Sequence, residues 1–112
     1  MMRCVDVDNE SQIVLIIGDT LKKTFEITDE NNTEDFYSTL NRVEFMCKEL
    51  SIFKDLTHKG NNLWELRVES EITSQYKPTV TDYNIRLHYN DGTTLTASYR
   101  VSFEVLENTN ER

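Results

Sequence analysis

The sequence predicts a small all-β domain, either an antiparallel sandwich of two sheets or a small barrel. In residues 83–89 and 95–105, apolar and polar side chains alternate, which is typical of strands with one buried and one wet face. Asn90-Asp91-Gly92 stands between them, and its Asp-Gly pair tolerates the positive φ of a tight hairpin turn. Turn residues also recur about every eight to twelve positions, so about seven to eight short strands are expected.

Length and composition fit one domain. The chain has 112 residues, enough for one hydrophobic core. We expect a single sandwich domain over residues 12–106. Residues 1–11 are predicted to be a poorly ordered tail or an edge segment, and residues 107–112 a polar C-terminal tail.

The charge narrows the class of partner. Asp and Glu number 20 and Lys and Arg 12, for a net charge of −8. Nucleic acids and anionic membranes bind positively charged surfaces, so we expect neither as a partner. The only long apolar run, residues 13–17, is too short for a membrane span or the core of a signal peptide.

That apolar run predicts a strand covered on both sides or one that passes between two sheets. It consists of Ile13, Val14, Leu15, Ile16 and Ile17. Because its apolar residues fall on both parities, the strand is a candidate for burial against another subunit. A central strand is the alternative interpretation.

Further strands are expected over residues 21–27, 42–48 and 63–69, with a shorter one near residues 51–55. An acidic loop over residues 28–35 and a turn over residues 58–62 separate them. Trp64 is the largest apolar side chain and the expected core anchor.

One short helical turn is predicted near residues 70–77. Ser70 would cap it and Glu71 would lie in its first turn. Pro78 ends it, because the residue before a proline avoids helical angles. The last apolar pattern, from Leu95 to Val105, is longer than a typical strand, so we expect a bend or bulge near Ser98.

The acidic loop is the best candidate for a cation site. In the first half of a calcium-binding loop, every second residue supplies an oxygen ligand. The residues at the corresponding positions here are Asp29, Asn31, Thr33 and Asp35. A calcium loop requires glycine at its sixth position, which is Glu34 here, and glutamate at its twelfth position, which is Leu40. The ligand set is incomplete, so a solvated loop is expected and no metal site is predicted.

The histidines and cysteines also lack ligand spacing. His58 falls in a turn and His88 on the outward face of a strand, so both are expected to be surface residues. Cys4 lies in the polar N-terminal run, and Cys47 shares the parity of buried residues. We therefore expect a small buried thiol rather than a disulfide framework.

No catalytic motif is visible. The glycines Gly18, Gly60 and Gly92 do not form a phosphate-binding loop. Strand serines such as Ser98 and Ser102 have no nucleophile motif around them. The sequence therefore predicts a protein that is not an enzyme and uses no cofactor.

Three segments, in order, resemble the small Ig-like β-sandwich modules of tailed-phage structural proteins, such as the N-terminal domain of baseplate upper proteins. Gly18-Asp19-Thr20 leading to Thr24-Phe25-Glu26-Ile27-Thr28-Asp29 is similar to the "GDT" opening and "TFTITD" strand of that family. Residues 43–49 resemble its "V-x-F-x-x-K" strand.

The third segment, residues 64–105, has the same order of features as the family: a strand, a helical turn, Lys77-Pro78, Tyr83-Asn84-Ile85-Arg86-Leu87, Asp91-Gly92-Thr93 and Phe103-Glu104-Val105. The resemblance covers residues 13–106. Thr79 replaces the family's glycine after the proline, and Asn84 replaces its aspartate.

The resemblance implies an Ig-like sandwich and a non-enzymatic virion structural or adaptor protein of a tailed phage or prophage. Such a protein would lie in a baseplate, tail or head appendage and bind other virion proteins or further copies of itself. It would be made in the cytoplasm of the bacterial host. The family has no catalytic residues to transfer to this chain.

The alternative function is a carbohydrate-binding or host-adhesion module on the same fold. It would require exposed aromatic side chains next to one another on one sheet face. The candidates mostly fall at inward positions or beside turns, where core packing is the expected role. They are Phe36, Tyr37, Tyr76, Tyr83, Tyr89 and Tyr99.

Overall fold

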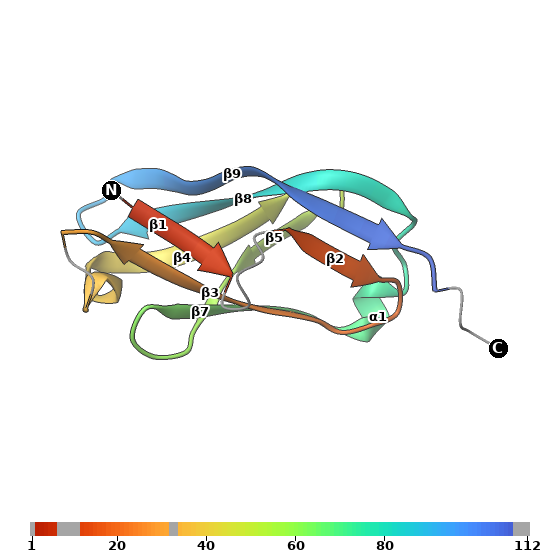
Figure 1. Cartoon of the computed structure of the whole chain (residues 1–112). Helices are drawn as coiled ribbons and strands as arrows, with labels where there is room; N and C mark the ends of the chain where they lie inside the picture. The colour runs from red at the N-terminus through yellow and green to blue at the C-terminus, as the bar shows by residue number, and fades with distance from the viewer. Residues whose placement is uncertain (1, 7–11, 32–33, 109–112) are drawn as a thin grey trace.

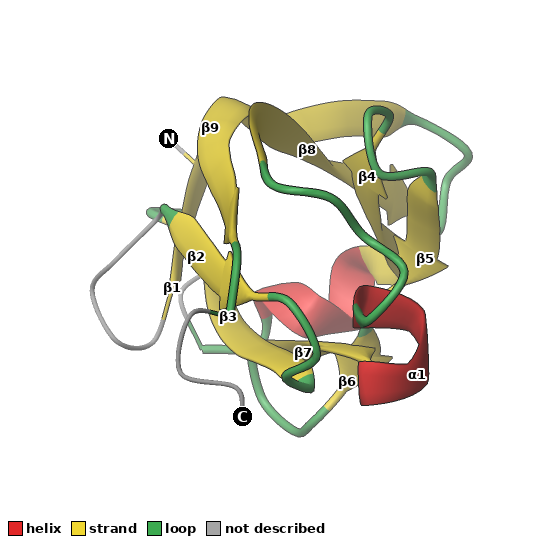
Figure 2. Cartoon of the chain, turned by 90° about the vertical axis from the view of Figure 1, so that its right-hand side faces the viewer, coloured by secondary structure: helices red, strands yellow, loops and turns green. Residues whose placement is uncertain are grey.

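Two β-sheets pack face to face in the computed structural model, which describes residues 2–6, 12–31 and 34–108 (Figures 1 and 2). Sheet A has the order β1 (Met2–Asp6), β3 (Leu21–Asp29), β7 (Leu63–Val68) and β6 (Thr57–His58). Sheet B has the order β2 (Ile13–Ile16), β9 (Thr94–Leu106), β8 (Thr79–Tyr89), β4 (Leu40–Cys47) and β5 (Ile52–Asp55). The predicted all-β sandwich is confirmed.

Neighbouring strands are antiparallel, except that β2 runs parallel to β9. β6 lies where a turn was expected, so the described residues form more strands than predicted. β1 is the edge strand of sheet A, whereas the rest of the predicted N-terminal segment, residues 1 and 7–11, lies outside the described residues. The Ig-like connectivity stays a prediction.

Aromatic rings form the centre of the core between the sheets. Phe25 on β3 packs against Phe45 on β4 and Tyr83 on β8, with ring centroids 6.5 and 6.1 Å away. Phe45 and Tyr83 stack at 4.8 Å, and Phe103 on β9 meets both rings edge-on. Trp64 is buried, as predicted.

The bulge expected near Ser98 is present, and it changes the face of the flanking residues. The pairing of β8 with β9 shifts register on both sides of Ile85, which pairs with Ser98. Arg100 adopts a left-handed φ of 52°, and its N–H donates to the Asn84 side chain at 2.8 Å. Tyr99, expected on the inward parity, is 66% exposed, because the extra residues of a bulge break the alternation.

The single-turn helix α1 (Ser70–Thr73) confirms the predicted helical turn, but its cap differs. Glu69, not Ser70, is the N-cap, and it makes no side-chain capping bond. Instead the buried Thr73 hydroxyl donates to the Asp19 carbonyl at 2.7 Å, which joins α1 to the turn after β2. The 3₁₀ helix η1 (Phe36–Thr39) was not predicted.

No helix among the described residues is long and apolar enough to cross a membrane.

Candidate assembly surface

The predicted assembly strand lies at the edge of sheet B. β2 has β9 on one side, and no described strand pairs with its other side. Ile13 and Leu15 are buried in the core, Val14 is 50% exposed, and Ile16 and Ile17 are partly exposed. The alternative of a central strand is therefore wrong for the described chain, whereas burial against another subunit stays a prediction. The continuous apolar run instead combines a core face with an outward apolar face.

At this edge, backbone groups of β2 have no strand partner among the described residues. The Ile17 N–H donates to the Leu106 carbonyl at 2.9 Å, in register with the pairing of Ile16 with Leu106. Alternate residues of a strand direct their backbone groups to the same side. The backbone groups of Val14 and Ile16 consequently point away from β9. Within the described residues, the Ile16 carbonyl is the one among them that has a partner, the Asp19 N–H at 3.0 Å.

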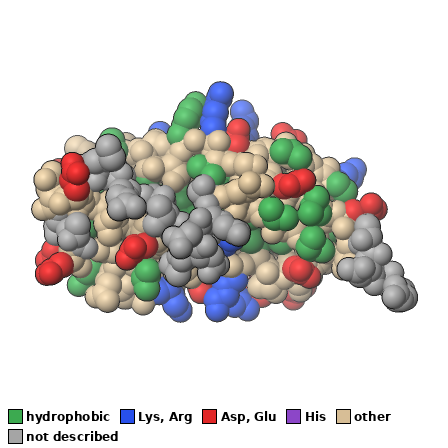
Figure 3. Space-filling view, in the orientation of Figure 1, with side chains coloured by type: hydrophobic (Ala, Val, Ile, Leu, Met, Phe, Trp, Pro, Cys, Tyr) green, Lys and Arg blue, Asp and Glu red, His purple; other side chains and the backbone are tan. Residues whose placement is uncertain are grey.

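An apolar patch continues from β2 across the outer face of sheet B. Val14 lies beside Glu104 on β9, which pairs with Val80 on β8, and Ile16 lies beside Leu106. Val80 is 72% exposed and Leu106 is 37% exposed. We call these residues the β2 patch: Val14, Ile16, Val80, Glu104 and Leu106. Figure 3 shows hydrophobic side chains gathered on the face that carries β2.

Glu104 is the one charged member of the β2 patch. Its side chain is partly buried among apolar neighbours. Within the described residues it makes no ion pair and no side-chain hydrogen bond. Its carboxylate is therefore hydrated rather than neutralised by this part of the chain.

A polar hollow adjoins the carboxyl end of β2. It has a volume of about 400 Å³ and is lined by Ile17, Gly18, Asp19, Ser74 and Asn108. The hydrogen bond from Thr73 to the Asp19 carbonyl fixes the turn on one side of it. The carboxyl end of β2 therefore lies beside a hollow that is lined by a second acidic residue, Asp19.

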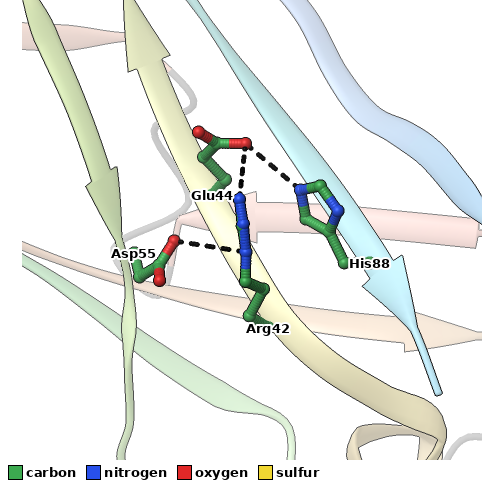
Figure 4. A network of polar contacts seen from close by, with 4 residues as sticks. All are labelled: Arg42, Glu44, Asp55 and His88. Carbon is green, nitrogen blue, oxygen red and sulfur yellow. Dashed lines mark hydrogen bonds and ion pairs between the residues drawn. The ribbon is translucent and has the colours of Figure 1, made fainter. Parts of the chain in front are cut away.

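Farther along the outer face of sheet B, a network of polar contacts joins three strands (Figure 4). The Glu44 carboxylate on β4 lies 3.3 Å from Arg42 Nη2 and 3.1 Å from His88 Nε2 on β8. Arg42 Nε lies 3.7 Å from Asp55 on β5. The cross-strand pairs in this network, Glu44 with His88 and Arg42 with Asp55, stabilise a sheet modestly.

The exposed aromatic residues do not lie next to one another. Phe53 projects from β5 and Tyr99 from β9, and β4 and β8 lie between those strands. Trp64 is buried beneath His58, whose ring stacks on it at 4.6 Å. The described residues therefore place no two strongly exposed rings side by side on one sheet face, and Phe53 and the partly exposed Tyr76 line one hollow of about 170 Å³.

The other predicted chemical candidates remain dispersed. Asp29 and Asp35 lie at opposite ends of the acidic loop, Thr33 lies outside the described residues, and the Asp29 carboxylate accepts the Asn31 N–H at 2.9 Å. His58 and His88 lie on different sheets. The described residues contain no group of three His, Cys, Asp or Glu side chains arranged to hold a metal ion.

Cys47 is a buried free thiol, as expected. Burial raises its pKa above the ordinary value, an effect that backbone hydrogen bonds at Leu50 and Glu49 partly oppose. A thiol held protonated in this way is a poor nucleophile and metal ligand. Cys4 lies in β1, on the other sheet.

Sequence reasoning found β2 but missed Val80, Glu104 and Leu106. Val80 and Leu106 alternate with the buried residues of their strands and therefore face outward. An apolar residue at such an alternate position is the signal that could have identified them. Their position beside β2 depends on the parallel pairing of β2 with β9, which no local pattern encodes.

A scan against models of known protein families finds no match to the chain, and a comparison with curated proteins finds none either.

Proposed function

We propose that the chain is a non-catalytic structural or adaptor module of a tailed phage or prophage. It joins other virion proteins, or further copies of itself, through the β2 patch and the free edge of β2. The module is made in the cytoplasm of the bacterial host and functions in the virion. The observation that carries the proposal is the unprotected edge strand.

Edge strands of soluble proteins usually carry a device that prevents pairing with another chain, such as a lysine, a proline or an inward charge. Charged residues make up 29% of this chain, yet none occurs from Ser11 to Gly18. The outward side chains of β2 are β-branched and apolar. This composition supports the proposal that the edge of β2 pairs with a strand of another chain.

The assignment to a phage rests on the ordered motif series over residues 13–106. The structural features add support only for an assembly role. Adaptors in symmetric assemblies use surface edges and apolar patches rather than enclosed pockets. The β2 patch has that character.

The test is incorporation of variants into particles. We expect Val14→Lys to remove the chain from purified particles, because a charge at the edge opposes strand pairing. Val14 is half exposed, so the variant should still fold. Thr96→Lys is the matched control, at an exposed position on the outer face of β9.

Thermal unfolding of both variants confirms that each is folded. Particles that contain the wild type and Thr96→Lys but not Val14→Lys would support the proposal. Equal incorporation of all three, or absence of the wild type from particles, would contradict it.

A further inference from the structure

We infer that the β2 patch binds an extended segment of another protein that carries a Lys or Arg side chain to Glu104. This inference rests on the proposed function and names the chemistry of the partner. Three observations carry it: the free backbone edge, the unpaired carboxylate in the patch, and the acids around it.

The free edge selects an extended partner. The Val14 N–H and carbonyl and the Ile16 N–H point away from β9. An added strand satisfies such groups with its own backbone, and alternate side chains then lie on the outer face beside Val14 and Ile16. The exposed β-branched side chain of Val14 favours small apolar residues at those positions.

Glu104 selects a cation. A partner that covers Val14, Val80 and Leu106 also removes water from the carboxylate between them. Burial of an unpaired carboxylate is unfavourable, whereas a Lys or Arg beside it restores the lost interaction. The long stems of these side chains also pack on apolar surface, so a residue on an added strand can reach across Val14.

Two further acids lie just beyond the carboxyl ends of β2 and β9. Asp19 lines the hollow at the end of β2, and Glu107 follows β9. Neither carboxylate makes an ion pair within the described residues. With a net charge of −8 on the chain, the field at the edge attracts a basic segment.

The same charges oppose a second copy of this chain at the β2 patch. A two-fold contact uses the same patch on both subunits. The β2 patch contains Glu104 and no Lys or Arg, so a second copy would bring another carboxylate and no cation. A basic segment of a different protein is therefore the better occupant.

The direct test uses three synthetic probe peptides with the same apolar core. They are Lys-Thr-Val-Thr-Val-Thr-Lys and its counterparts with Glu or Gln at both ends, so that the end residues and the valines lie on one face of the added strand. Amide chemical shifts of the full-length protein report the site. We expect the Lys peptide to shift Val14 and Ile16 and to bind at least about tenfold more tightly than the Glu peptide.

In Glu104→Gln, the preference for the Lys peptide over the Gln peptide should be clearly smaller than in the wild type, and only the part due to Asp19, Glu107 and the net charge should remain. Equal affinity for the Lys and Glu peptides, binding away from β2, or no binding by any peptide would overturn the inference. Concentration-dependent dimerisation that Glu104→Gln strengthens would identify a second copy as the occupant, and would also overturn it.

Particle incorporation separates this inference from the proposed function. If Val14→Lys and Glu104→Lys are both lost from particles, both proposals stand. If Val14→Lys is lost and Glu104→Lys is retained, the edge is used but the basic partner is wrong. If both are retained, the proposed function fails as well.

Discussion

Arg100 shows how one residue redirects a strand. It has a left-handed φ of 52° in the bulge of β9, where its guanidinium lies 5.3 Å from the centre of the Tyr99 ring. A left-handed backbone is unfavourable for a residue with a Cβ, by roughly 1–2 kcal/mol. The Asn84 side chain compensates by accepting the Arg100 N–H at 2.8 Å.

We therefore expect Arg100→Gly to be more stable than Arg100→Ala by about 1 kcal/mol, because glycine adopts this backbone without strain. The free energy of unfolding in urea measures the difference. The control is Thr96, which lies in the same strand without a positive φ, where Gly should be less stable than Ala. The same order of Gly and Ala at both positions would contradict the backbone argument.

Asp91 carries a pH dependence of stability. Its carboxylate accepts the Thr93 hydroxyl at 2.7 Å and the Thr93 N–H at 2.9 Å, and these bonds hold its pKa below the ordinary value. The unfolded chain then binds more protons just below the ordinary pKa of about 3.9. The stabilisation is present above that pH and is lost as the pH falls through the folded pKa.

Asp91→Asn removes this titration. We expect its free energy of unfolding to fall less than that of the wild type between about pH 6 and about pH 2.5. Thr93→Val, which keeps only the N–H donor, should give an intermediate dependence. Equal pH dependence in all three proteins would show that the turn does not perturb Asp91.

At the scale of elements, β2 has two faces with different roles. Leu15 is buried in the core, whereas Val14 is half exposed and belongs to the β2 patch. We expect Leu15→Ala to lower the free energy of unfolding by about 2–5 kcal/mol. Val14→Ala should lower it by less than about 1 kcal/mol. Denaturant titration of the two variants measures both, and comparable losses would mean that Val14 is a core residue.

The sequence predicted elements whose pairing is local. β8 and β9 flank Asp91-Gly92, and their alternation and turn residues are adjacent in the chain. The edge position of β2 could not be predicted, because it depends on the distant pairing of Ile13 with Phe103. The outward face of Tyr99 was missed for another reason: the length of the apolar pattern predicted a bulge but not the face that each flanking residue would take.

At the scale of the whole molecule, the two edges of sheet B differ. β5 ends the sheet with the exposed residues Phe53, Lys54 and Asp55, so its edge carries both charges. β2 ends it without a charged residue. This asymmetry leaves β2 as the edge of sheet B whose residues carry no charge that opposes pairing with another chain.

The proposed assembly role fits the surface of the described residues. Polar side chains predominate in the lining of three hollows on the described surface, and the groups of Figure 4 pair within β4 and across to β5 and β8. A surface of this kind suits binding through an edge and a patch, which require shape and apolar area rather than converging reactive groups.

Site-specific photo-crosslinking in cells that assemble the particle is the most direct test of assembly through β2. A photoreactive amino acid would replace Val14 and, as the matched control, the exposed Thr96. We predict a discrete adduct between position 14 and another virion protein, with little or none from position 96. No adduct from position 14, or equal adducts from both positions, would contradict the assignment of β2 as the assembly edge.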